Sequence, residues 1–246
     1  MLNLGMKHIL VILSFLNCMN LISQSTGKVT YKVSIVKDST DLPNTNPEKT
    51  EIQNDVLAMI HGSQDVESYL VFNDSIALYT VEPKTELPIW NNDNDVITTE
   101  RAKINLAWIF AGGESLFYSD LSRNWNISQQ EVFGVTKRVK RDSIKWEITT
   151  ETKEILGYKC IKANLVEDSN SEVWYTSQIP VEHGPHGYNG LPGLILEVKF
   201  GKMVYFKAQS VDFENTEYLD IEEPVSGEIV TSEDYRKLGQ IYLYDD

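Results

Sequence analysis

The sequence predicts a mainly β protein, built as a curved, half-barrel-like antiparallel sheet with one packed helix and a short C-terminal helix. Apolar and polar residues alternate over short segments, as in Val29, Tyr31, Val33 and Ile35, which share one face of a strand. Such segments recur at regular spacing with few long helical patterns between them, which favours an antiparallel sheet or barrel. The chain also holds 12 Tyr, 8 Phe and 5 Trp, residues that suit strands and fill a core.

Several further segments show a strand-like pattern. Residues 194–200 alternate and run into the turn Gly201-Lys202, so they predict a hairpin with residues 204–208. The acidic and polar stretches 87–100 and 214–230 predict loops. The remaining predicted strands lie near 67–72, 75–81, 104–110, 115–118, 143–150, 158–166 and 171–176.

The predicted packed helix begins at Asn46, which can cap it, with Pro47 at its first position and Gly62 after its end. Ile52, Val56 and Ile60 recur every four residues and form one apolar stripe, which we expect to lie against the sheet. The short C-terminal helix is predicted from Thr231, because residues 231–234 resemble a capping box.

Residues 1–23 have the organisation of a secretory signal peptide, which leaves residues 24–246 as a single β-rich domain. Lys7 supplies the positive charge, residues 9–16 form an apolar run, and Ser23 is small enough for a cleavage site. The run is far shorter than the roughly 20 residues that a membrane span needs. Lipidation at Cys18 is the alternative, although Asn17 stands where a lipidation site has Gly or Ala. The sequence thus predicts an exported protein that is periplasmic, outer-membrane-associated or secreted, with no membrane span.

Charge and cysteine content narrow the classes of function. The formal net charge of −14 opposes binding to nucleic acid or to anionic lipid surfaces. Cleavage near Ser23 would leave Cys160 as the only cysteine, so the mature chain would have no internal disulfide and would depend on its core. No cofactor is predicted, and the oligomeric state is left open.

The segment 179–195 is rich in Gly and Pro and leads directly into a predicted strand. Its hexapeptide, Gly190-Leu191-Pro192-Gly193-Leu194-Ile195, resembles the motif that names the GLPGLI family of exported Bacteroidota proteins. Residues 155–163, Trp174-Tyr175-Thr176 with Ile179-Pro180, and Gly184-Pro185 are similar to further blocks of that family, in the same order. The resemblance implies an exported envelope protein, and it brings no established activity with it.

Chemistry-bearing motifs are few, and no catalytic residue is predicted. No Gly-x-Ser-x-Gly motif is present, and an unrecognised hydrolase remains one alternative. A zinc- or copper-binding envelope protein is the other, if the fold brings Cys160, His183 and His186 together. These residues can also have purely structural roles. The two histidines would then be solvated loop residues, and Cys160 would be a small buried residue of the core.

The leading prediction is a non-enzymatic envelope protein that binds an apolar small molecule or another envelope protein. A curved sheet with a helix against it can leave an apolar cavity, and the loop 183–195 is expected at the edge of the site. The same aromatic residues also suit ordinary core packing. The predicted ligand- or partner-binding residues are Tyr188, Asn189, Leu191, Pro192, Trp174 and Tyr175.

Overall fold

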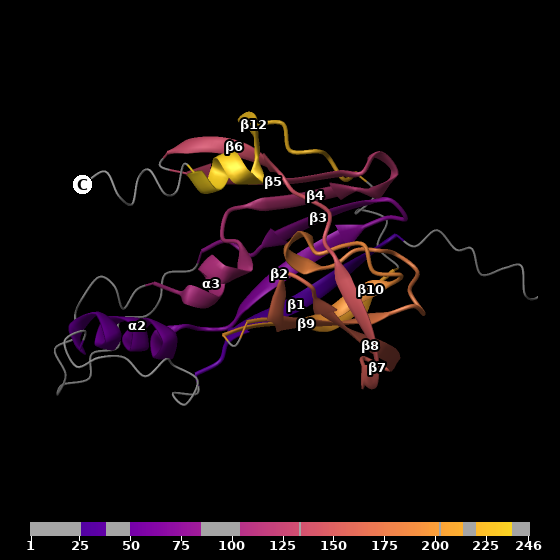
Figure 1. Ribbon diagram of the computed structural model, residues 1–246, viewed down its shortest axis with the longest axis horizontal. Helices are drawn as coiled ribbons and strands as arrows, with labels where there is room; N and C mark the ends of the chain where they lie inside the picture. The colour runs from indigo at the N-terminus through magenta and orange to yellow at the C-terminus, as the bar shows by residue number, and fades with distance from the viewer. Residues whose placement is uncertain are drawn as a thin grey trace, which may run out of the picture.

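The computed structural model describes residues 26–37, 50–84, 104–132, 134–201, 203–213 and 220–237 (Figure 1). The predicted signal peptide, the predicted helix cap at Asn46 and Pro47, and the predicted loop 87–100 lie outside these residues. Within the described part of the chain, no helix is both long and apolar enough to span a membrane.

The prediction of a mainly β fold is confirmed. The described strands form one twelve-stranded sheet in the order β12-β6-β5-β4-β3-β2-β1-β11-β10-β9-β8-β7. Neighbouring strands are antiparallel except at one edge, where β12 runs parallel to β6. The strands are β1 (Gly27–Ile35), β2 (Val66–Phe72), β3 (Ile76–Val81), β4 (Leu116–Asp120), β5 (Trp125–Val132), β6 (Val135–Lys140), β7 (Trp146–Ile155), β8 (Tyr158–Leu165), β9 (Asp168–Thr176), β10 (Leu194–Phe200), β11 (Val204–Asp212) and β12 (Glu228–Thr231).

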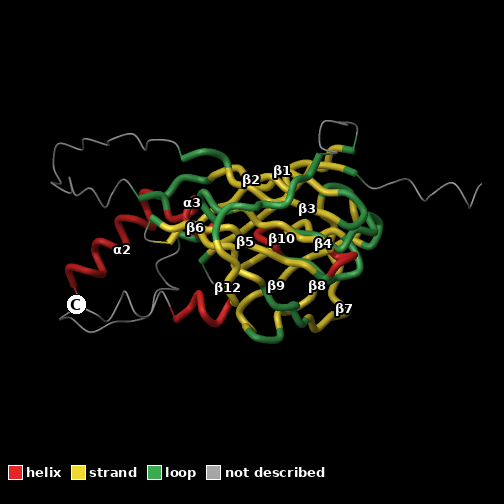
Figure 2. Tube along the Cα trace, turned by 90° about the horizontal axis from the view of Figure 1, so that it is seen from above, coloured by secondary structure: helices red, strands yellow, loops and turns green. Residues whose placement is uncertain are grey.

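The sheet is strongly curved, and its own side chains demonstrate the curvature. Strands β4 and β11 stand four places apart in the sheet, which corresponds to about 19 Å in a flat one. Yet the ring of His186 lies 4.3 Å from Phe117 on β4 and 5.9 Å from Phe206 on β11, measured between ring centroids. The sheet therefore wraps around His186, and Figure 2 shows the strands enclosing a common interior.

The predicted helix is present as α2 (Thr50–Gly62), but it does not lie flat on the sheet. It projects from the side of the sheet in Figures 1 and 2, with Val56 40% exposed and Ile60 near its end buried. The helix that packs on the sheet is instead α3 (Leu106–Ala111), which contacts β1, β2 and β11.

The strand predicted at 104–110 is wrong, because local capping makes this segment a helix. The Asn105 side chain accepts a hydrogen bond from the backbone N–H of Ala107, which caps the start of α3. Gly112 ends the helix at φ 118°, and its N–H donates to the carbonyl of Ile109. Gly112 and Gly113 thus turn the chain from a helix into β4, and not from one strand into another.

The C-terminal region contains the predicted short helix and one strand that the loop prediction missed. Residues 232–237 are helical, and the backbone N–H of Asp234 donates to Thr231 Oγ1 at 3.1 Å, as a helix cap requires. Before this helix, β12 begins at Glu228, within the stretch 214–230 that was predicted as a loop. The predictions also missed β5 and β6, whereas the predicted hairpin of β10 and β11 is confirmed.

Candidate functional site

The Gly- and Pro-rich segment folds into the interior of the curved sheet. Its short 3₁₀ helix η5 (Pro185–Gly187) contacts β2, β3 and β4. Trp146 Nε1, at the start of edge strand β7, donates to the carbonyl of Asn189 at 2.8 Å. Farther along the loop, Gly193 takes a φ of 153° and lies against the backbone of Thr176. The loop therefore packs on the concave side of the sheet, and His186 within it lines a neighbouring pocket.

His186 stands at the centre of this loop, with a backbone φ of 55° that non-glycine residues rarely adopt. Its ring packs among Phe117, Tyr79 and Phe206. Burial, reinforced by the positive charge of Arg141, lowers the pKa of His186 to about 3. The imidazole is therefore neutral at neutral pH.

Arg141 follows β6 and holds the loop through the His186 backbone. Its Nη1 donates to the His186 carbonyl oxygen at 2.7 Å, and its guanidinium carbon lies 5.3 Å from the centre of the Phe117 ring. Burial lowers the pKa of Arg141, although a guanidinium stays charged at any ordinary pH. Gly187 makes this approach feasible, because a Cβ there would stand 2.5 Å from Nη1.

A pocket of about 340 Å³ opens beside Arg141 and His186. It lies between α3, strands β4 to β6 and the C-terminal helical turn, which lies alongside β5, β6 and β12 in Figure 1. The residues that line it are Ile109, Gly112, Ser115, Phe117, Ser128, Gln130, Val139, Arg141, His186, Ser232, Tyr235 and Arg236.

A chain of hydrogen bonds orders the polar wall of this pocket. The Tyr235 hydroxyl donates to Gln130 Oε1 at 2.7 Å, which fixes the orientation of that amide. Gln130 Nε2 then donates to Ser128 Oγ, also at 2.7 Å. Ser128 therefore accepts in this chain and keeps its own hydroxyl proton available as a donor.

The predicted binding residues are mostly buried. Tyr188, Leu191, Trp174 and Tyr175 belong to the core, and burial raises the pKa of Tyr188 to about 12. Asn189 is also buried, and its Nδ2 donates to Asn126 Oδ1 at 2.8 Å. These five residues anchor the loop and the sheet, while Pro192 alone of the predicted set is exposed.

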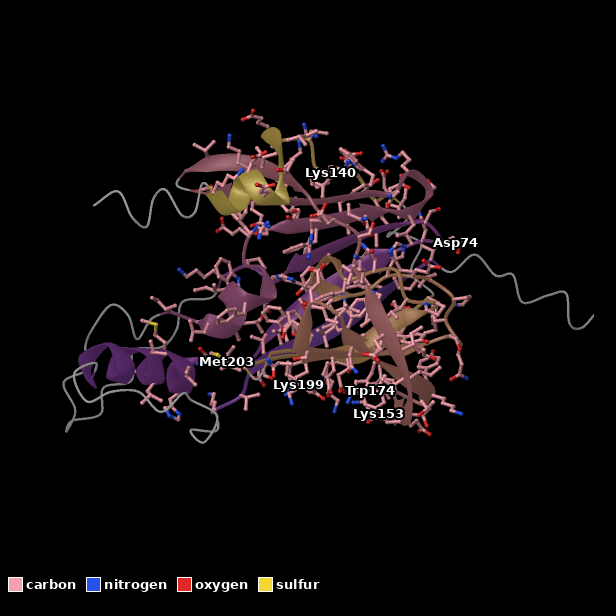
Figure 3. The ribbon with its side chains drawn as sticks, in the orientation of Figure 1. Asp74, Lys140, Lys153, Trp174, Lys199 and Met203 are labelled. Carbon is pink, nitrogen blue, oxygen red and sulfur yellow. The ribbon has the colours of Figure 1, made fainter. Side chains whose placement is uncertain are left out.

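Trp174 packs beside a partly buried ion pair and does not line the pocket. The Lys153 ammonium lies 4.2 Å from the centre of the Trp174 ring and forms an ion pair with Glu197, which is 5% exposed. Figure 3 shows Lys153 and Trp174 close together, at the opposite end of the molecule from Lys140. This cluster is therefore separate from the pocket at Arg141.

The structure does not bring the alternative metal ligands together. His183 Nδ1 lies 3.2 Å from Ser119 Oγ, His186 sits among aromatic rings, and Cys160 is near Lys153 and Glu197. Across the residues that the structure describes, no group of three or more His, Cys, Asp or Glu side chains is placed to hold a metal ion. The histidines are also not the solvated loop residues of the structural interpretation, because His183 is 1% exposed and the partly buried ring of His186 packs against Phe117. Cys160 is buried, in agreement with that interpretation.

The pocket residues gave no local signal in the sequence. Phe117, Ser128, Arg141 and Tyr235 come from separate segments, and only the fold places them around one space. The alternation of Trp125 and Ile127 with the polar residues Asn126 and Ser128 could have indicated β5. Nothing in the residues near Arg141 marks it as a pocket residue.

Comparisons with known proteins give one family match. Residues 114–225, just under half of the chain, match the family described as "N-glycanase peptide, N-terminal domain". No curated protein matches the chain.

Similar solved structures include two of PNGF-II, in space groups P21 and C2. They are 18% and 17% identical to this chain, with TM-scores of 0.49 and 0.48. Each match covers 88% of this chain, and it covers 33% and 32% of the PNGF-II chains. This chain therefore spans about a third of the length of the solved proteins that it matches.

Proposed function

We propose that this chain is an exported, non-enzymatic binding protein of the cell envelope, and that it binds a glycan in the pocket between α3, β4 to β6 and the C-terminal helical turn. The observation that carries the proposal is the packing of the loop around His186 against strands on the concave side of the sheet. Because the loop around His186 occupies the concave side, a ligand has to bind beside that loop instead of inside a barrel.

The composition of the pocket favours a ligand with one apolar face and several polar groups. Ile109, Phe117 and Val139 provide apolar surface, while Ser128 and Gln130 provide fixed hydrogen-bonding groups. A sugar ring combines these two kinds of surface, and sites of this kind use a few well-placed polar groups for specificity. This is a change from the apolar ligand that the sequence predicts.

The family match adds support from a different direction. The matching family describes the N-terminal domain of an N-glycanase, and the match includes Phe117, Arg141 and His186. We propose by analogy that this chain shares a glycan-directed role, without the enzyme activity. Export, and kinship with the GLPGLI proteins that the segment 190–195 resembles, are parts of the same proposal.

A pair of neighbouring substitutions tests the site. Ser115 lines the pocket, while the adjacent Glu114 is exposed and outside the lining. Ser115→Trp should block the pocket and abolish binding on an array of immobilised N-glycans, whereas Glu114→Trp should bind like the unchanged chain. Equal binding by both variants, or no binding by the unchanged chain, would refute the proposal.

A protein partner is the second candidate, because α3 exposes two consecutive large apolar side chains beside the pocket. Ile109 is 50% exposed and Phe110 is 38% exposed. A photo-crosslinking residue at position 110 should then form one discrete adduct in cells that export the protein. The same residue at exposed Lys145 serves as the control, and equal labelling from both positions would remove this candidate.

A further inference from the structure

The pocket is positively charged within a strongly acidic protein. The chain has 36 Asp and Glu against 22 Lys and Arg, yet the pocket lining includes Arg141 and Arg236 and no acidic residue. The pocket beside β12 contains Glu228 and Asp234, and the pocket near β7 contains Glu154 and Glu197, so each of these carries its own counter-charges. The local charge at Arg141 is therefore opposite to that of the protein as a whole.

Arg141 has no acidic partner within the described part of the chain. Its guanidinium donates one side-chain hydrogen bond there, to the neutral carbonyl of His186, and it faces the ring of Phe117. A guanidinium has five N–H donors in a planar fork that matches a carboxylate, a sulfate or a phosphate. A buried or half-buried charge is costly when it has no counter-charge, so an incoming anion would gain a strong charge-assisted interaction.

The surrounding groups are donors that suit an oxyanion. Ser128 is 1% exposed, accepts from Gln130 and can donate its hydroxyl proton. Arg236 is exposed at the rim of the pocket, and no ion pair engages it among the residues that the structure describes.

We infer that this pocket binds the anionic group of its ligand, a carboxylate, sulfate or phosphate, through Arg141 with Ser128 and Arg236 in support. The inference rests on the proposed function, because it names the chemical class of the glycan that enters the same pocket. A neutral glycan would leave the guanidinium of Arg141 without a counter-charge. A uronic acid or a sulfated or phosphorylated sugar would supply that counter-charge.

Four hexoses that differ only at carbon 6 test this inference by calorimetric titration of the full chain. The probes are glucose, glucuronate, glucose 6-sulfate and glucose 6-phosphate. At least one of the anionic sugars should bind about 10- to 100-fold more tightly than glucose, the range expected for a charge-assisted hydrogen-bonded pair. The anion that binds most tightly identifies the source of the charge, and its affinity should fall as salt is raised.

Variants separate this inference from the proposed function. Arg141→Gln should remove the preference for the anionic sugar, and Arg141→Lys should restore only part of it, because an ammonium lacks the planar fork. Arg236→Gln should weaken anion binding without affecting folding, since the side chain is exposed and forms no ion pair among the residues that the structure describes. Arg138→Gln is the matched control, because Arg138 binds the carbonyl of Gly227 and does not line the pocket.

Two results would overturn the inference. If glucose and the anionic sugars bind equally and both Arg141→Gln and Arg236→Gln leave that binding unchanged, the anion site is refuted while the glycan pocket stands. If none of the four sugars binds although Ser115→Trp abolishes glycan binding on the array, the anion site is again refuted and the proposed function survives. If none of the four sugars binds and the unchanged chain also binds no glycan on the array, both the anion site and the proposed function are refuted.

Discussion

The Nη1 atom of Arg141 donates a hydrogen bond to the backbone carbonyl of His186 at 2.7 Å. This bond joins the end of β6 to a loop 45 residues later in the chain, and it fixes two features together. It holds His186 in its left-handed conformation, and it points a guanidinium toward the pocket. The shape of the loop and the charge of the pocket are therefore coupled.

Gly187→Ala should break this coupling. A Cβ at position 187 would stand 2.5 Å from Arg141 Nη1, and the backbone φ of 76° is itself unfavourable for alanine. The conformational cost alone is about 1–2 kcal/mol. Gly157→Ala is the matched control, because Gly157 has a φ of 81° with nothing near its Cβ position. Chemical denaturation should show a larger loss of unfolding free energy for Gly187→Ala, and an equal loss would contradict the close approach of Arg141.

Acid should destabilise the protein through its two loop histidines. Burial lowers the pKa of His183 to about 4 and that of His186 to about 3, from an ordinary value of 6.5. Below pH 6.5 the unfolded chain binds protons that the folded chain excludes, so the unfolding free energy falls as the pH drops. The fall should approach about 1.4 kcal/mol per pH unit for each histidine, and level off below their folded pKa values.

Substitution of each histidine shows how much of this pH dependence of the unfolding free energy comes from that residue. His183→Asn and His186→Asn should each flatten the slope of unfolding free energy between pH 6.5 and the respective folded pKa. A slope that neither variant changes would contradict the lowered pKa values of these two histidines.

Cys160 should be unreactive in the folded protein. The residue is fully buried, and burial raises the pKa of its thiol to about 11, so the reactive thiolate is scarce at neutral pH. In a Cys18→Ser chain, a thiol reagent should label Cys160 only after denaturation. Rapid labelling under native conditions would contradict its burial.

The ion pair of Lys153 and Glu197 should be sensitive to the loss of its lysine, because Glu197 is the buried partner. The side chain of Glu197 is 5% exposed, whereas that of Lys153 is 33% exposed. Lys153→Met therefore leaves a buried carboxylate without its counter-charge and should cost about 3–5 kcal/mol of unfolding free energy. The double variant Lys153→Met with Glu197→Leu should recover much of that loss. For comparison, Lys32→Met breaks an exposed pair with Asp65 and should cost less than about 1 kcal/mol. A double variant as unstable as Lys153→Met would contradict this description of the pair.

The sequence predicted the strands best where alternation was regular, as in β1, β2 and the hairpin of β10 and β11. It failed at residues 104–110, because a short apolar run fits a strand or a buried helix equally well, and the Asn105 cap and Gly112 stop decide between them. Half-barrel curvature was predicted, but the loop on its concave side was not, since its position depends on the packing of His186 against Tyr79, Phe117 and Phe206 on three separate strands. The pocket was missed for the same reason, because Phe117 and Arg141 meet only in three dimensions.

The location of the bound sugar tests the central claim most directly. In a ¹⁵N-labelled chain titrated with the most tightly bound anionic hexose, the side-chain resonances of Arg141 Nε and Gln130 Nε2 should shift and saturate together, and Arg141→Gln and Gln130→Glu assign them. Resonances of Lys153 and Trp174, which do not line the pocket and lie at the opposite end of the molecule from Lys140, should stay in place. Saturable shifts confined to Lys153 and Trp174, with Arg141 and Gln130 unaffected, would contradict the assignment of the pocket as the binding site.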